Sequence, residues 1–277
     1  MSWSALFVRW AGVPAPASAF YRVLIAAAVL LPWRLVRGPR RPSDRRTILL
    51  AIAGGVFFAF DLLLFNSAVL RTSAATSVLL GNNAPIFVGL GTWFFLGKRP
   101  RALFWAGLGL ALSGCAFIVF ADAAVSSGAI AGDPFGDLLA LSAAVFWAAY
   151  MLTTERVRTE MDTLTFNTLA VTASALTLLA VCLATSVPLS GYSAHTWAAL
   201  AALAFVSQLA AYYALVYALG HLPATVTSVS ILAQVPLTAI LAAAFLAEPL
   251  SSAQLTGAAV VLAGVYVVNR KGDGDKE

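Results

Sequence analysis

The few ionisable residues inside long apolar segments are the first candidates for chemistry in this chain. Asp61 lies 14 residues after Thr47, near the middle of one such segment, while Arg9 and Arg22 lie in the two preceding segments. A charged side chain inside a bilayer costs about 2.5–3.5 kcal/mol on insertion scales, and such residues often serve ion or substrate pathways. A pair of Asp61 with Arg22 or Arg9 therefore predicts a proton-coupling carboxylate, a clasp for a zwitterionic ligand, or a buried structural ion pair.

Two prolines inside apolar segments, Pro85 and Pro236, are the second signal. Proline removes one backbone hydrogen bond and kinks a helix, so we expect two bending points, Gly81 to Pro85 and Leu232 to Pro236. Polar groups at membrane depth either line a cavity or pair with neighbouring helices. In a cavity, the polar residues beside the prolines could bind the ammonium and carboxylate groups of an amino acid. These residues are Asn82, Asn83, Ser228, Ser230 and Gln234.

Aromatic side chains at a similar depth could build an apolar wall. Helical spacing places three pairs each on one face: Asp61 with Phe65, Trp147 with Tyr150, and Tyr213 with Tyr217. Such rings fill the bundle, face lipid, or line a cavity for a bulky neutral ligand. The predicted substrate-binding residues are Asp61, Phe65, Asn82, Asn83, Trp147, Tyr150, Tyr213, Tyr217, Ser230 and Gln234.

No spacing in the sequence indicates a metal site or a nucleophilic triad. His195 and His221 are isolated, and Cys115 and Cys182 lie in apolar stretches without metal-ligand spacing, as small apolar residues of helices do. We therefore expect no catalytic residues, no metal and no cofactor. A membrane-embedded enzyme, such as a lipid-modifying transferase, is a less favoured alternative, because it needs acids and histidines clustered near one interface.

The composition indicates which elements must position these residues. Of the 277 residues, 61% are hydrophobic and 10% are charged, against about 25% charged in an ordinary soluble domain. The mean hydropathy is +0.88. A chain this apolar cannot cover itself with a charged surface, which excludes a soluble enzyme, a disordered protein and a nucleic-acid-binding domain. The composition predicts an integral membrane protein built of helices.

Nine apolar segments are long enough to span a bilayer, which takes about 20 residues, and one shorter segment precedes them. Residues 2–11 cover about 15 Å of helix, so we interpret them as the outer half of a first spanning helix. No soluble domain fits between the segments. The longer segments are 17–37, 47–70, 73–97, 101–121, 136–156, 163–187, 196–219, 222–247 and 252–269.

The basic residues predict how the helices are oriented. Most of the 17 Lys and Arg residues fall in four groups, at 34–46, 98–101, 156–158 and 270–276. With ten spans, all four groups lie on one side, which is the cytoplasm under the positive-inside rule. We therefore expect both termini in the cytoplasm and the protein in the cytoplasmic (inner) membrane. The net charge of +5 reflects this topology and predicts no nucleic-acid partner.

The two halves of the chain repeat one pattern. Residues 72–114 align with 223–264, and the aligned pairs are Thr76-Ser77 with Thr227-Ser228, Pro85 with Pro236, Gly107 with Gly257 and Gly114 with Gly264. Each half holds five helices, an odd number, so the second half is inverted relative to the first, as in many secondary transporters. We expect an all-α integral membrane protein of ten transmembrane helices in two inverted five-helix repeats, residues 1–122 and 135–271, together forming one transmembrane domain.

The repeated segments resemble a known family. NAPIFVGLGTWFFLGKRP and AQVPLTAILAAAFLAEPL, each followed by its pair of glycines, are similar to the signature of the drug/metabolite transporter superfamily in its EamA branch. The stretch SALFVRWAGVPAPASAFYRVLIAA is similar to that family's first loop and second helix. Lys98 stands where the family usually has Glu, and the first helix lacks its cytoplasmic half. The resemblance implies export of small metabolites, often amino acids.

These observations together predict a secondary transporter that works by alternating access around a central cavity. The aromatic residues and the scarcity of intramembrane charge favour neutral, hydrophobic or aromatic amino acids with broad specificity. A multidrug carrier, or a sugar or nucleotide-sugar carrier of the same fold, is the alternative, and Asp61 would then oppose a cationic drug. Proton antiport, uniport and exchange all stay open, as do a monomer and a homodimer. The expected partners are a small-molecule substrate and the lipid bilayer.

Overall fold

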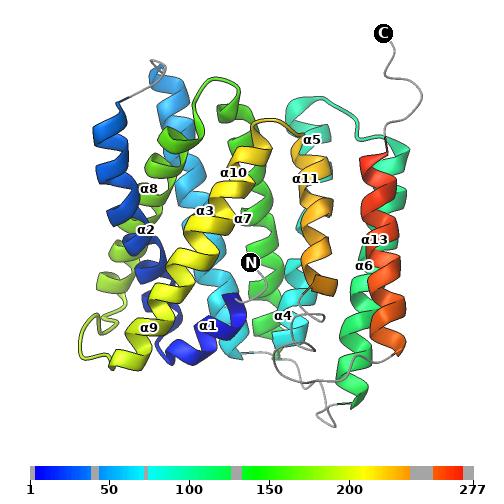
Figure 1. Cartoon of the computed structure of the whole chain (residues 1–277), viewed down its shortest axis with the longest axis horizontal. Helices are drawn as coiled ribbons and strands as arrows, with labels where there is room; N and C mark the ends of the chain where they lie inside the picture. The colour runs from blue at the N-terminus through cyan, green and yellow to red at the C-terminus, as the bar shows by residue number, and fades with distance from the viewer. Residues whose placement is uncertain (1–3, 39–43, 72–73, 126–132, 238–251, 271–277) are drawn as a thin grey trace.

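The computed structural model describes residues 4–38, 44–71, 74–125, 133–237 and 252–270, and this part of the chain folds into helices without strands (Figure 1). Most helices run side by side along a common direction. The first half contains α1 (Ser4–Ala11), α2 (Ala15–Arg37), α3 (Arg45–Arg71), α4 (Ala74–Gly81), α5 (Ala84–Leu96) and α6 (Ala102–Val125). The second half contains α7 (Pro134–Arg158), α8 (Thr163–Ala184), α9 (Ala194–Ala202), η1 (Leu203–Tyr212), α10 (Tyr213–Leu219), α11 (Ala224–Ser230), η2 (Ile231–Ala233) and α13 (Ser252–Asn269).

Seven helical segments of the described chain are long and apolar enough to cross a bilayer: α2, α3, α4 with α5, α6, α7, α8, and α9 through α10. Two shorter apolar helices are Ala224–Leu237 and Gln254–Asn269. The segments predicted from the sequence agree with the described helices to within a few residues, and the last part of the predicted segment 222–247 lies outside the described residues. The long apolar segments are therefore helices, as the composition requires of membrane spans.

The outward surface of the bundle is apolar. Phe117 on α6, Leu176 on α8 and Phe205 on η1 are all exposed, although each is a large hydrophobic side chain in the middle of a helix. Single exposed apolar residues are common in soluble proteins, but rows of them on several long helices indicate a surface that faces lipid.

The core lies where α3 packs against α7 and α8, in the middle of the bundle (Figure 1). Two adjacent glycines of α3 allow the close approach: a Cβ atom at Gly54 would lie 3.3 Å from Thr153 of α7, and Gly55 faces the backbone of Ala170 on α8. α2 packs against α8 and α3, and α4 and α5 pack against α7. These contacts bring the polar residues of α2, α3 and α7 into one interior.

Two of the helices are interrupted near their prolines. α4 ends at Gly81 and α5 begins at Ala84, with Pro85 in the first turn of α5, where a backbone N–H has no helical partner to lose. In the second half, α11 passes into the 3-10 turn η2, and the chain is helical again from Gln234 to Leu237. The four residues predicted to be bending points all lie at or beside these two interruptions.

The helix from Ala194 to Leu219 changes its winding along its length. It begins as α9, continues as the π-helix η1, and returns to α-helical winding in α10. A π-helix bonds each residue to the fifth rather than the fourth along the chain, so its faces do not follow α-helical spacing. Ser207, Gln208 and Tyr212 of η1 are buried.

α6 and α13 form a tight pair at one side of the bundle (Figure 1). Gly107 faces Gly264 and Gly114 faces Gly257, so the two helices run antiparallel and cross at four glycines. Cys115 is buried in the small apolar cluster around this crossing. The glycines remove the side chains that would otherwise hold the two backbones apart.

Candidate functional site

A buried polar cluster lies inside the bundle, where α2, α3, α7 and η1 meet. Its positive charge is Arg22 of α2, which is 2% exposed. The Nε of Arg22 donates a hydrogen bond of 2.9 Å to the Oε1 of Gln208. Its guanidinium carbon lies 4.9 Å from the centre of the Tyr212 ring, within the range of a cation–π interaction. Two residues of the π-helix therefore hold one arginine in place.

The acidic residue of the cluster is Asp61 of α3, which is 8% exposed. Asp61 interacts electrostatically with Arg22, and also with Tyr150 and Tyr212. Each charge would be costly alone in this interior, and the presence of the opposite charge reduces that cost. Asp61 and Arg22 therefore form one electrostatic unit, as the sequence predicted for one of its two alternative pairs; the side chain of Arg9 lies outside the described residues.

Aromatic rings surround this electrostatic unit. The Phe58 ring centre is 5.0 Å from that of Tyr150 and 4.8 Å from that of Tyr212. Trp147 stacks on Tyr150 at 5.4 Å and meets the edge of Tyr212 at the same distance. We define these four rings, Phe58, Trp147, Tyr150 and Tyr212, as the aromatic wall. Each aromatic pair contributes about 0.5–1.5 kcal/mol beyond its buried area, so the wall is a well-packed aromatic surface beside Arg22 and Asp61.

A second group of polar side chains extends the cluster along α2 and α3. Asn66 donates a hydrogen bond of 2.9 Å to the hydroxyl of Ser18, and Ser18 lies one helical turn before Arg22. Among the described residues, the Oδ1 of Asn66 and the Oγ of Ser207 have no hydrogen-bond partner, and both side chains are fully buried. An unpartnered buried polar atom costs about 1–3 kcal/mol. Because such atoms are rare in folded proteins, each one calls for an explanation, and a functional role is one such explanation.

The structure brings three of the predicted binding residues, Asp61, Trp147 and Tyr150, into this cluster. Phe65, one helical turn after Asp61, lies instead against Gly81 at the end of α4: a Cβ atom at Gly81 would be 3.4 Å from the Phe65 ring. Phe65 therefore lies beside the break between α4 and α5.

The two asparagines at that break have different roles. The Asn83 side-chain amide donates to the carbonyl oxygens of Leu79, at 3.0 Å, and Leu80, at 3.1 Å, and so satisfies carbonyls at the end of α4. Asn82 is buried, and its Nδ2 has no partner among the described residues. Of the two, Asn82 has an amide group with hydrogen-bonding capacity left for a ligand.

Tyr213 and Tyr217 do not reach the cluster. The Tyr213 ring stacks on Trp33 of α2, with 6.2 Å between ring centres, and Tyr217 is 56% exposed beside His221. Tyr212 occupies the interior position instead. α-Helical spacing cannot identify Tyr212 or Gln208 as interior residues, because the π-helix changes which side chains face inward.

The remaining predicted residues lie in the second interrupted helix. Ser230 donates a hydrogen bond of 2.8 Å to the carbonyl of Val226 and accepts one of 3.0 Å from Asn269 of α13, so its hydroxyl ties two helices together. Gln234 is half-buried and begins the short helical stretch after η2. The described residues contain no group of three or more His, Cys, Asp and Glu side chains able to hold a metal ion.

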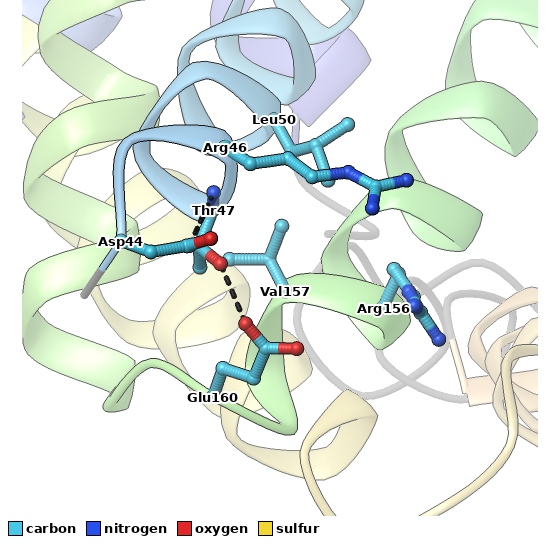
Figure 2. A pocket seen from close by; sticks show the side chains of 7 residues that line it. All are labelled: Asp44, Arg46, Thr47, Leu50, Arg156, Val157 and Glu160. Atoms are coloured by element: carbon cyan, nitrogen blue, oxygen red, sulfur yellow. Dashed lines mark hydrogen bonds between the residues drawn. The ribbon is translucent and has the colours of Figure 1, made fainter.

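A separate small pocket lies at the end of the bundle where α3 begins and α7 ends (Figure 2). The Thr47 hydroxyl donates to the Oε2 of Glu160 at 2.6 Å, and the Thr47 N–H donates to Asp44 at 2.9 Å. Figure 2 shows Arg46 and Arg156 on the side away from Asp44. The pocket holds about 80 Å³, well below the roughly 300 Å³ of small ligand sites. We therefore interpret it as a hydrogen-bonded junction between α3 and the α7–α8 link.

The long apolar helices, with large hydrophobic side chains exposed along them, place the chain in the class of multi-pass membrane proteins. The chain belongs to the EamA-like transporter family, because the family model matches residues 1–120 and 134–270. The resemblance inferred from the proline and glycine segments is therefore confirmed.

Known proteins similar to this chain carry transporter names. An uncharacterized transporter of Archaeoglobus fulgidus is 29% identical over 91% of this chain and 87% of its own length. A probable terminal-alkyne amino-acid exporter of Streptantibioticus cattleyicolor is 27% identical over 90% of this chain and 82% of its own length. One crystal structure matches with a TM-score of 0.77 at 22% identity, covering 97% of this chain and 92% of that chain, which shows a shared fold.

Proposed function

We propose that this protein is a secondary transporter that exports small metabolites across the cytoplasmic membrane, with neutral and aromatic amino acids as its main substrates. The observation that carries the proposal is the buried unit of Arg22 and Asp61 beside the aromatic wall. A zwitterion has one group for each of the two charges, and an aromatic side chain has a stacking surface in the wall. The name of the relative from Streptantibioticus cattleyicolor, an amino-acid exporter, supports the same class of cargo.

The transport cycle proposed here is alternating access by two inverted five-helix repeats, residues 1–122 and 135–271. Three observations support it: the family model matches the chain in two stretches close to these bounds; both halves contain a helix interrupted beside a proline; and α6 crosses α13 at glycines that occupy equivalent places in the two repeats. An inverted repeat lets the halves exchange conformations, which opens the central site to each side in turn.

The interruptions at Asn82-Asn83 and at η2 are the proposed bending points of the cycle. A broken helix lacks part of its hydrogen-bond ladder, so one half can tilt against the other at lower cost than in a continuous helix. Asn82 and Phe65 in the first half lie beside such a break, where movement of α4 would change their distance from the site.

The direct test is uptake into proteoliposomes that contain the purified protein. Labelled phenylalanine and tryptophan should enter in a saturable way, with threonine competing and rhamnose not competing. A quaternary ammonium dye is the comparator for a multidrug carrier, because Asp61 is a buried carboxylate that could oppose a cation. Movement of the dye or the sugar without movement of amino acids would contradict the proposed cargo. Running each assay with and without a pH gradient separates proton antiport from uniport and exchange.

A further inference from the structure

The last turn of α7 contacts both sides of the link between α10 and α11, which consists of residues 220–223. The Oε2 of Glu155 accepts a hydrogen bond of 3.0 Å from the backbone N–H of Ala224, the first residue of α11. One turn further along α7, the Nε of Arg158 donates a hydrogen bond of 3.2 Å to the carbonyl oxygen of Val216 on α10. Two charged side chains of one helix therefore hold the two helices that the link joins.

The sequence of the link suits these two contacts. Pro223, the residue before α11, makes no side-chain hydrogen bond to the first turn of that helix, and Glu155 satisfies one N–H of the turn from a different helix. Gly220 allows the guanidinium of Arg158 to lie directly against the backbone, because a Cβ atom at Gly220 would be 2.5 Å from the Nη2 of that arginine. The link is thus fitted to α7 at two points.

The helix held in this way is one that the proposed transport cycle moves. α11 runs into the interruption at η2, a proposed bending point, while α7 is packed in the core against α3, where Gly54 faces Thr153. Arg156 and Arg158 lie in the last turn of α7, and the positive-inside rule assigns that turn to the cytoplasmic face. When α11 tilts at η2, its first turn leaves α7 at this face, and the two hydrogen bonds break.

We propose that Glu155 and Arg158 form a latch that keeps the cytoplasmic end of the transporter closed, and that the α10–α11 link moves away from α7 when this end opens. The inference rests on the alternating access and the orientation of the proposed function, and it does not depend on the identity of the cargo. Loss of one hydrogen bond to a charged group should raise the population of the open state at least about tenfold.

Access of a thiol reagent to α11 tests the latch without a substrate. Ser228 lies one turn beyond Ala224 on the same face of α11 and is 3% exposed, so the thiol of Ser228→Cys should react slowly while the link is closed. The substitution is made in a protein whose buried cysteines, Cys115 and Cys182, are replaced by alanine. Modification by a membrane-impermeant methanethiosulfonate reagent is then measured in inside-out and in right-side-out membrane vesicles.

Variants of the latch should raise the modification rate from the cytoplasmic side alone. We expect an increase of at least about tenfold with Glu155→Ala, which removes the acceptor, and with Arg158→Met, which keeps the stem of the side chain but removes its donors. Gly220→Ala should act in the same direction, because its Cβ displaces the guanidinium. Glu155→Gln should stay near the rate of the intact latch, because glutamine keeps an acceptor for the Ala224 N–H.

Glu160→Ala is the matched control. Glu160 lies at the same end of the bundle as the latch, but it accepts a hydrogen bond from Thr47 of α3 (Figure 2). Its removal should therefore leave the rate of Ser228→Cys unchanged. A rise as large as that in Glu155→Ala would contradict the assignment to the α10–α11 link.

The possible outcomes separate the latch from the function on which it rests. An unchanged rate in both Glu155→Ala and Arg158→Met would overturn the latch, and so would an equal rise from the two sides, which indicates local unfolding. A rise confined to the outer side would overturn the cytoplasmic assignment. If one of these variants does not fold, Gly220→Ala still decides. Absence of phenylalanine uptake by the wild-type protein would contradict the proposed cargo and leave the expected modification rates as they are.

Discussion

Gly107 of α6 and Gly264 of α13 touch backbone to backbone: a Cβ atom on Gly107 would lie 2.7 Å from the Gly264 carbonyl oxygen, and one on Gly264 would lie 2.6 Å from that of Gly107. Gly114 and Gly257 repeat this contact further along the pair, at 2.8 and 3.0 Å. Gly107 aligns with Gly257 in the repeat, and Gly114 with Gly264. The contact is therefore reciprocal, as a two-fold relation between the two halves of the chain would require.

Substituting a glycine of this crossing should destabilise the protein. In Gly114→Ala, the new Cβ would lie 2.7 Å from the Val261 backbone nitrogen, which cannot move as a flexible side chain can. We expect a loss of about 1–3 kcal/mol, as for overpacking in a well-packed core. The measurement is thermal unfolding of the purified protein in detergent. Gly109→Ala on the same helix is the control, because nothing lies within 4 Å of its Cβ. Equal melting of the two variants would contradict the crossing.

Removing the prolines at the helix interruptions should slow transport. Pro85→Ala and Pro236→Ala each restore a backbone N–H and favour a continuous helix, so the tilting step becomes more costly. We expect each transport rate to fall several-fold while the amount of protein in the membrane stays unchanged. Pro32→Ala is the control, since Pro32 lies inside the uninterrupted helix α2. Wild-type rates in both Pro85 and Pro236 variants would exclude these bending points.

The tyrosines of the π-helical segment should separate into two classes. Tyr212→Ala removes a ring that contacts Arg22, Phe58 and Trp147, interactions that contribute about 1–2 kcal/mol, so KM should rise about tenfold. Tyr217→Ala should change KM less than about twofold, because this ring is exposed beside His221. Transport rates measured over a range of substrate concentrations give the KM of each variant. A larger effect at Tyr217 than at Tyr212 would favour the site predicted by simple helical spacing.

Acid should destabilise the protein partly through Asp162, at the start of α8. Burial raises the pKa of this carboxyl, but the hydroxyl and N–H of Thr165 and the charge of Arg34 outweigh burial and hold the pKa below its ordinary value of 3.8. A carboxyl with a lowered pKa contributes stability above about pH 4, and that contribution is lost as the pH falls through the folded-state pKa.

Asp162→Asn tests this linkage. Asparagine still caps the helix but does not titrate, so the variant should lose less melting temperature than the wild type between pH 5 and pH 3. The comparison is the difference between the two melting curves at each pH, which cancels the other groups that titrate in this range. Parallel losses in both proteins would show that Asp162 does not contribute.

The sequence predicts the helices and their interruptions well, because these depend on local physics. Long apolar runs give the helix bounds, and the two prolines mark where the ladder of hydrogen bonds is broken. Gly107 and its three partners are recognisable as a repeated pattern of small residues. Asp61 and Arg22 stand out because charges in apolar segments are rare.

The partners of those charges are not readable from the sequence. Gln208 is 186 residues from Arg22, and nothing local indicates that the two meet. Helical spacing in the sequence does not distinguish Tyr212 from Tyr213. The π-helical winding and the tertiary packing decide which of the two rings faces inward. Asn83 was predicted as a ligand-binding amide, yet the structure uses it to satisfy the carbonyls of Leu79 and Leu80. Binding of substrate by the Asn83 amide stays a prediction.

Counterflow tests the central claim, a carrier with one amino-acid site at the Arg22–Asp61 unit, most directly. Proteoliposomes are loaded with unlabelled phenylalanine and diluted into a trace of labelled phenylalanine. A carrier that exposes one site to each side in turn predicts a transient accumulation of label above equilibrium, and this overshoot should disappear in Arg22→Gln and persist in Arg34→Gln. Label that only approaches equilibrium in the wild-type protein, without overshoot, would contradict an alternating-access carrier for amino acids.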